Sequence, residues 1–124
     1  MEIVWVGIGG GIGAVCRYLV GRELSERIGG MFPWGTFAVN LSGALLIGVL
    51  FALLTEKGIG HDHLRLLLVV GLLGGYTTFS SYTLEAVNLL ESGDWATALL
   101  YLLGSNLAGL AACAIGIWAT RAAF

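Results

Sequence analysis

The chain alternates four long apolar stretches with short segments that hold nearly all of its charged residues. A helix needs about 20 residues to cross a hydrocarbon layer of about 30 Å, and each stretch is long enough. We therefore predict an all-α membrane protein with four transmembrane helices. The predicted spans are approximately residues 3–20, 34–54, 64–84 and 95–120. Tryptophans lie near the ends of these spans, where amphipathic rings favour the headgroup region.

The third stretch is interrupted by a polar sequence from Gly74 to Tyr82, GGYTTFSSY. The two glycines weaken a helix at this point. Irregular backbone at membrane depth is tolerated only where it lines a cavity or binds a ligand. We therefore expect the third helix to be broken near its middle, and we expect the function to depend on this segment.

The composition indicates one integral membrane domain over residues 1–124, with 57% hydrophobic and 11% charged residues. The first span opens with Glu2 and has no basic leader, so we expect it to be retained. The longest predicted loop runs from Gly21 to Pro33. A net charge of -2 provides no basic surface for nucleic acid, and the only two histidines lie in one loop. We therefore expect neither nucleic-acid binding nor enzymatic activity.

Apart from Arg17 and Arg65 near the span ends, the polar residues that we single out inside the predicted spans are uncharged and can all donate hydrogen bonds. They are Asn40, Ser42, Thr77, Thr78, Ser80, Ser81, Thr83, Tyr101, Ser105 and Asn106. A proton-coupled carrier normally needs a titratable group at this depth, so the pattern favours passive conduction of a small anion. Alternatively, the hydroxyls bond to the preceding helical turn and Asn40 joins two helices. Phe79 and Tyr82 share a helical face; their ring edges suit an anion, although core packing is the commoner use of such a pair.

The basic residues predict no preferred orientation in the membrane. If the amino terminus is cytoplasmic, that side holds Lys57, Arg65 and Arg121, and the other holds Arg17, Arg22 and Arg27. Because an excess of Lys and Arg normally sets orientation, this balance predicts insertion in both directions and an antiparallel homodimer. A small bias hidden by uncertain loop edges is the alternative. Glycine pairs such as Gly9 with Gly13 and Gly71 with Gly75 predict close helix contacts, within or between subunits.

Three segments resemble, in the correct order, signatures of the Fluc or CrcB fluoride channels of microbial membranes. The signatures are G-x-G-A-x-x-R-Y within Gly10–Tyr18, G-T-x-x-V-N-x-x-G within Gly35–Gly43, and G-G-x-T-T-F-S within Gly74–Ser80. The likeness extends to the chain length and the four spans, and it covers nearly the whole chain.

This resemblance implies passive export of toxic fluoride through a dual-topology homodimer with two pores. It also implies a structural Na⁺ at the dimer centre, held by backbone carbonyls of Gly74 and Thr77 from each copy. For the pore, the resemblance assigns Phe79 and Tyr82, where Tyr82 replaces the family's usual second phenylalanine. It also assigns Asn40, as a donor to the anion or as a contact that positions the rings. The further pore donors implied by the resemblance are Ser80, Ser81, Thr83, Tyr101 and Ser105.

Arg17 ends the first predicted span, where it either attracts anions in a vestibule or stabilises the helix end from the interface. The expected partners are fluoride, a second copy of the chain and membrane lipid, in the inner membrane of a prokaryote. Two other functions stay open. One is a dual-topology carrier similar to small multidrug resistance transporters, which need a carboxylate within a helix; Glu85 is the nearest. The other is a non-conducting paralogous subunit of a heteromeric fluoride channel.

Overall fold

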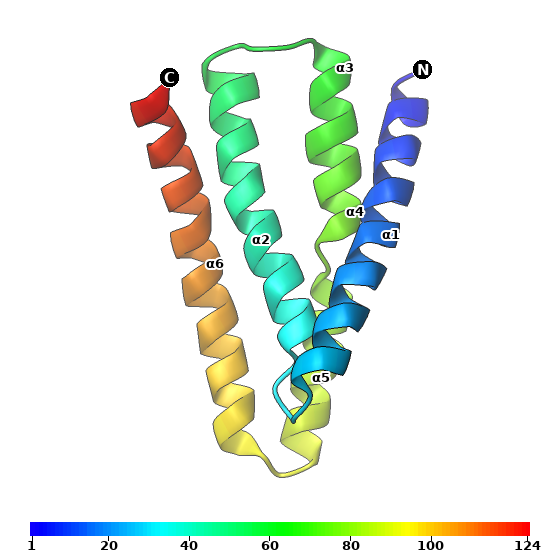
Figure 1. Cartoon of the computed structure of the whole chain (residues 1–124), viewed down its shortest axis with the longest axis vertical. Helices are drawn as coiled ribbons and strands as arrows, with labels where there is room; N and C mark the ends of the chain where they lie inside the picture. Colours follow the sequence, from blue (N-terminus) through cyan, green and yellow to red (C-terminus); the bar gives the residue numbers. More distant parts are fainter.

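The computed structural model describes residues 1–124 as a bundle of four membrane-length helical spans joined by short loops. The elements are α1 (Glu2–Ile28), α2 (Trp34–Leu50), η1 (Phe51–Glu56), α3 (Asp62–Arg65), η2 (Leu66–Leu73), α4 (Gly74–Tyr76), α5 (Phe79–Glu91) and α6 (Trp95–Ala123). The second span combines α2 with η1, and the third combines α3, η2, α4 and α5. Both termini lie at one end of the bundle (Figure 1). The predicted all-α fold, with four spans and a broken third helix, is confirmed.

Helix α1 continues well beyond the expected end of the first span, so the prediction of a long first loop is wrong. The helix reaches Ile28, and the connection to α2 contains only Gly29–Pro33. Oppositely charged side chains four residues apart can stabilise an exposed helix that has no apolar face. The pairs in this part of α1 are Arg22 with Glu26, at 3.1 Å, and Arg27 with Glu23. Gly29, with a φ of 68°, then ends the helix.

Helix α1 packs against η2 and α4 through glycines that bring two backbones into contact. A Cβ atom at Gly9 or Gly13 would collide with the main chain of the third span. In return, a Cβ at Gly71 or Gly75 would collide with the main chain of α1. These two predicted pairs therefore make contacts within one subunit. The glycines of α1 that face open space are Gly7, Gly11 and Gly21.

Helices α2 and α6 meet in a similar way. A side chain at Gly48 of α2 would collide with the carbonyl of Cys113, and one at Gly116 of α6 would collide with the backbone of α2. Near the ends of this pair, Arg121 Nη2 lies 2.6 Å from Glu56 Oε2. Close packing of small residues lets helices associate where lipid removes the hydrophobic driving force.

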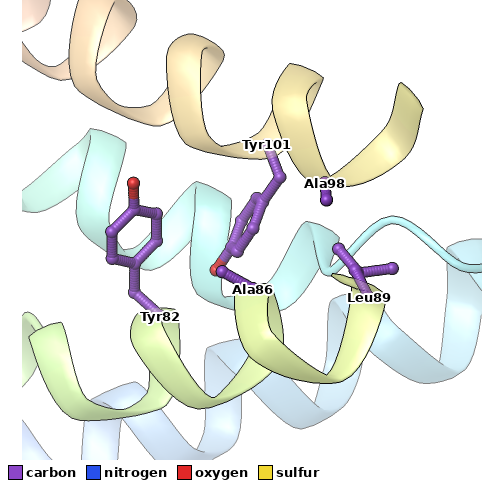
Figure 2. Close-up of a cluster of buried hydrophobic side chains, with 5 residues drawn as sticks. All are labelled: Tyr82, Ala86, Leu89, Ala98 and Tyr101. Atoms are coloured by element: carbon purple, nitrogen blue, oxygen red, sulfur yellow. The ribbon is translucent and has the colours of Figure 1, made fainter. Parts of the chain in front are cut away.

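The best-buried side chains fill the space between α5 and α6. Figure 2 shows Tyr82, Ala86 and Leu89 of α5 on one side, with Ala98 and Tyr101 of α6 on the other. The two tyrosines extend in opposite directions, each toward the other helix, and their ring centroids are 5.2 Å apart. Tyr101 has no exposed surface, and Tyr82 is 8% exposed. This tyrosine pair therefore sets the spacing of α5 and α6 beside the helix break.

Candidate functional site

The third span is interrupted at Thr77 and Thr78, between α4 and α5. Both residues have extended backbone torsions, with ψ values of 154° and 119°. Thr78 caps the start of α5, because its hydroxyl oxygen accepts a 3.1 Å hydrogen bond from the amide of Ser81. Threonine is a favourable residue at this position, since its side chain satisfies an amide that has no partner within the helix.

Asn40 of α2 pairs with the backbone of Thr78 and thereby stabilises the break. Its Nδ2 donates to the carbonyl oxygen of Thr78 at 2.9 Å, and its Oδ1 accepts from the amide of Thr78 at 2.8 Å. An unpaired backbone group in a membrane interior is costly, so this side chain takes the place of a peptide partner. The alternative that Asn40 joins two helices is confirmed, and its contact with an anion stays a prediction.

These contacts remove the carbonyls of Gly74 and Thr77 from the helical hydrogen-bond ladder. In a continuous α-helix, the amide of Thr78 would bond to Gly74, and that of Ser81 would bond to Thr77. Here Asn40 and the Thr78 hydroxyl take those two amides instead. Both carbonyl-bearing residues line an open groove, so acceptor oxygens are available beside it.

Arg17 of α1 carries a positive charge to the end of α4. The side chain is half-buried, and its Nε donates to the carbonyl oxygen of Gly75 at 3.1 Å. The carboxyl end of a helix has partial negative charge, which a nearby cation stabilises. Arg17 therefore contributes to the structure of the break, and its attraction of anions stays a prediction.

The open groove beside the break has a volume of about 460 Å³ and lies between α2, both halves of the third span, and α6. The predicted site residues that line it are Asn40, Gly74, Thr77, Phe79, Tyr82 and Ser105. Thr78 and Asn106 line it as well; both are among the predicted donors inside the spans, although the family resemblance gave them no place in the pore. The signal for Thr78 is its position as the N-cap of α5. The signal for Asn106 is that the buried Tyr82 hydroxyl needs a hydrogen-bond partner.

Phe79 and Tyr82 lie next to each other at this groove, with ring centroids 5.9 Å apart and an interplanar angle of 46°. Their environments differ, because Phe79 is 76% exposed and Tyr82 is 8% exposed. The Tyr82 hydroxyl is held by α6, where Asn106 Nδ2 lies 3.0 Å away. One ring is therefore fixed in the subunit, and the other is left uncovered by it.

Ser105 of α6 contributes a buried hydroxyl that has no hydrogen-bond partner. An unsatisfied buried polar group costs about 1–3 kcal/mol. Ser105 also lines the groove, so this unpaired hydroxyl lies beside the groove and beneath its accessible surface.

The remaining predicted donors of the third span lie next to the groove without lining it. Ser81 lines a smaller cavity, of about 150 Å³, together with Arg17. Ser80 is exposed and its Oγ lies 3.3 Å from Thr78 Oγ1, while Thr83 donates back to the Ser80 carbonyl at 3.0 Å. Thr83 thus bonds to the preceding helical turn, as the alternative interpretation of these hydroxyls predicted. A place for Ser80, Ser81 and Thr83 in an ion path stays a prediction.

Tyr101 lies in the core between α5 and α6, apart from the groove. Its hydroxyl donates to Glu85 Oε1 at 3.3 Å. Glu85 itself belongs to α5, because this helix continues to Glu91, past the expected end of the third span. The fourth-helix donors Tyr101 and Ser105 are therefore separated, and only Ser105 reaches the groove.

Four apolar helical spans, a broken third span and a groove lined by apolar and uncharged polar residues define the class of small multi-pass membrane proteins. The family model described as CrcB-like protein, Camphor Resistance (CrcB), matches residues 4–117. This chain belongs to that family. The resemblance inferred from the three sequence signatures is thereby confirmed.

Several relatives are similar to the chain over nearly its whole length, and each is named a fluoride-specific ion channel FluC. The relative from Magnetococcus marinus is 44% identical over 117 residues, which are 94% of this chain and 95% of the relative. The relative from Novosphingobium aromaticivorans is 49% identical over 116 residues, covering 91% and 90%. The relative from Hahella chejuensis is 45% identical over 120 residues, covering 97% and 94%. The chain is accordingly a multi-pass membrane protein of a prokaryote.

Proposed function

We propose that this protein is a fluoride channel through which F⁻ leaves the cell passively, so that toxic fluoride does not accumulate. The observation that carries this proposal is its similarity, at 44% and 49% identity over more than nine tenths of the chain, to channels named for fluoride. The groove supports the same function, because its lining contains hydroxyl, amide and aromatic groups and no carboxylate, lysine, arginine or histidine. A channel carries out no covalent chemistry, in agreement with the expectation that the chain is not an enzyme.

Fluoride is small and strongly hydrated, so a path for it must offer several close donors without holding it tightly. Ser105 provides an unpaired hydroxyl just beneath the groove surface, and a turn of this side chain would present it to the ion. Asn40 uses only one of its two amide protons on Thr78, so the second remains for an anion. The edge of the Phe79 ring carries positive potential and adds a weak contact. All of these groups are uncharged, which allows the ion to leave as well as to enter.

We further propose that a second copy, inserted in the opposite direction, completes the path. The groove is open, and the apolar ring of Phe79, one of its lining residues, is 76% exposed. A two-fold axis in the membrane plane would place one such groove on each side of the pair, giving two pores. The balanced count of basic residues permits both orientations.

The freed carbonyls at the helix break fit a structural Na⁺ at the centre of this pair. The residues that would hold it are Gly74 and Thr77, through backbone oxygens, the kind of ligand that hard cations prefer. The Thr77 hydroxyl donates its proton to the Leu73 carbonyl at 2.9 Å, and the proposed contribution of Thr77 to the ion is its freed carbonyl. When bound, the ion would add a central positive charge and neutralise these carbonyl dipoles.

The carrier alternative keeps one supporting observation, the half-buried carboxylate of Glu85 inside α5. Glu85 lies outside the groove, beside the loop that joins α1 to α2. A channel requires no coupling, whereas a carrier of this kind would exchange its substrate for protons. The dependence of fluoride efflux on an imposed pH gradient therefore distinguishes the two functions.

The experiment uses the purified protein alone in liposomes loaded with fluoride, with efflux followed by a fluoride electrode. We expect rapid efflux that excludes chloride and is unaffected by a pH gradient. Phe79→Ile removes the ring edge and should slow efflux by about tenfold, because one aromatic contact is worth about 0.5–1.5 kcal/mol. Phe51→Ile is the matched control, since Phe51 lies on η1 away from the groove.

The control variant should conduct like the unmodified protein, and both variants should remain dimeric on size exclusion. No fluoride efflux from the unmodified protein would contradict the proposed function and would favour the non-conducting subunit. Equal efflux through Phe79→Ile would remove this ring from the path.

A further inference from the structure

Tyr82 and Asn106 form a hydrogen-bonded pair that connects α5 to α6 at the border of the groove. Asn106 Nδ2 donates to Tyr82 Oη at 3.0 Å and to its own helix, at the Leu102 carbonyl, at 2.8 Å. The Tyr82 hydroxyl in turn lies 3.4 Å from the same Leu102 carbonyl. Both side chains line the groove. The hydroxyl is therefore engaged with α6 through its oxygen and through its proton.

The double use of Nδ2 fixes the direction of the Asn106 amide. An asparagine within a helix often satisfies itself on a nearby backbone carbonyl, and the bond to Leu102 is of this kind. That bond takes one amide proton and leaves the other directed at Tyr82. The asparagine thus serves as a fixed donor to the tyrosine hydroxyl.

The same contact fixes the ring of Tyr82. One end of the ring is covalently anchored on α5, and the other is bonded to α6, 24 residues away in the chain. The ring is 8% exposed and packs 5.9 Å from Phe79 and 5.2 Å from Tyr101, measured between centroids. A tyrosine held at both ends has little freedom to turn its hydroxyl away from α6.

We propose that Asn106 is a positioning residue for the ion path: it keeps the Tyr82 hydroxyl bound to α6 and directs the ring edge, instead of the hydroxyl, toward fluoride. Without Asn106, the hydroxyl keeps only its long contact of 3.4 Å to the Leu102 carbonyl, which is weak enough for the hydroxyl to turn toward the groove. A phenolic O–H is a strong donor to a small anion, so a freed hydroxyl would hold fluoride and slow its passage. This inference rests on the proposed function.

The test compares fluoride efflux from liposomes for the unmodified protein and for Asn106→Leu, Tyr82→Phe and the double variant. Asn106→Leu should slow efflux by about tenfold, the factor that corresponds to one retained hydrogen bond to the ion. Tyr82→Phe in the Asn106→Leu background removes the freed hydroxyl and should restore efflux to within about threefold of the unmodified rate. Asn88→Leu is the matched control on α5, where no hydrogen bond of the side chain is lost.

A purely structural role for Asn106 would predict that the second substitution adds to the damage. Slow efflux in the double variant, with a dimer intact on size exclusion, would therefore overturn the proposal, as would unmodified efflux in Asn106→Leu. If Asn106→Leu fails to fold, Asn106→Ala provides the same comparison with a smaller side chain. Absence of efflux from the unmodified protein would instead overturn the proposed function, and the inference with it.

Discussion

At Asn40, a side-chain amide supplies the hydrogen bonds that the interrupted third helix lacks. Its two bonds to Thr78, at 2.9 and 2.8 Å, have the donor and acceptor pattern of a peptide group. They also free the Gly74 carbonyl, because the amide of Thr78 no longer donates to it. One residue on α2 therefore stabilises the break and frees one of the two carbonyls beside the groove.

Replacing Asn40 should destabilise the protein more than replacing an exposed asparagine. Asn40→Leu leaves the amide and carbonyl of Thr78 unpaired, and we expect a loss of about 2–4 kcal/mol in the free energy of unfolding. Asn40→Asp keeps the acceptor for the Thr78 amide and loses the donor. Its free energy of unfolding should therefore lie between those of the unmodified protein and Asn40→Leu. Thermal unfolding in detergent measures the effect, with Asn88→Leu as the control. Equal melting temperatures for Asn40→Leu and Asn88→Leu would show that this pairing is not needed.

At the scale of elements, the third span is held by the backbone of α1. Gly9 and Gly13 leave room for the main chain of η2 and α4, which in turn presents Gly71 and Gly75. Arg17 adds a bond to the Gly75 carbonyl at the end of this contact. The break is consequently not a flexible joint, because α1 fixes its first half and Asn40 fixes the start of its second.

A methyl group at this contact should separate the two helices. A Cβ at Gly13 would collide with the carbonyl of Leu72, and a backbone atom cannot move aside as a side chain can. Overpacking of this kind costs about 1–3 kcal/mol, so Gly13→Ala should lower the melting temperature and the yield of folded protein. Gly21→Ala on the same helix meets open space and is the control. A Gly13→Ala protein as stable as Gly21→Ala would contradict the close packing of α1.

The sequence predicted the elements better than their ends or their partners. The break was predictable because the pair Gly74-Gly75 and the following hydroxyls are local signals. The continuation of α1 to Ile28 was missed, because ion pairs stabilise that part without an apolar pattern. The pairing of Asn40 with Thr78 joins residues 38 positions apart, and no local pattern encodes such a contact.

For the whole molecule, the groove is the feature that a single chain leaves incomplete. It gathers residues from α2, both halves of the third span and α6, and it stays open. Phe79, which has the most exposed ring at its border, has no covering partner within the chain. The proposed antiparallel pair would cover this ring and bring the freed carbonyls of two breaks together. The proposed function therefore requires both orientations in one membrane.

The most direct test of this dependence is the orientation of the chain, measured with single cysteines and an impermeant maleimide. Ser92→Cys, in a protein with Cys16 and Cys113 replaced by alanine, lies at the turn between α5 and α6, opposite the two termini (Figure 1). His61→Cys marks the other end of the bundle, in the loop between η1 and α3. Insertion in both directions predicts that roughly half of each variant is labelled from outside intact cells. Complete labelling of one variant and none of the other would contradict the antiparallel pair.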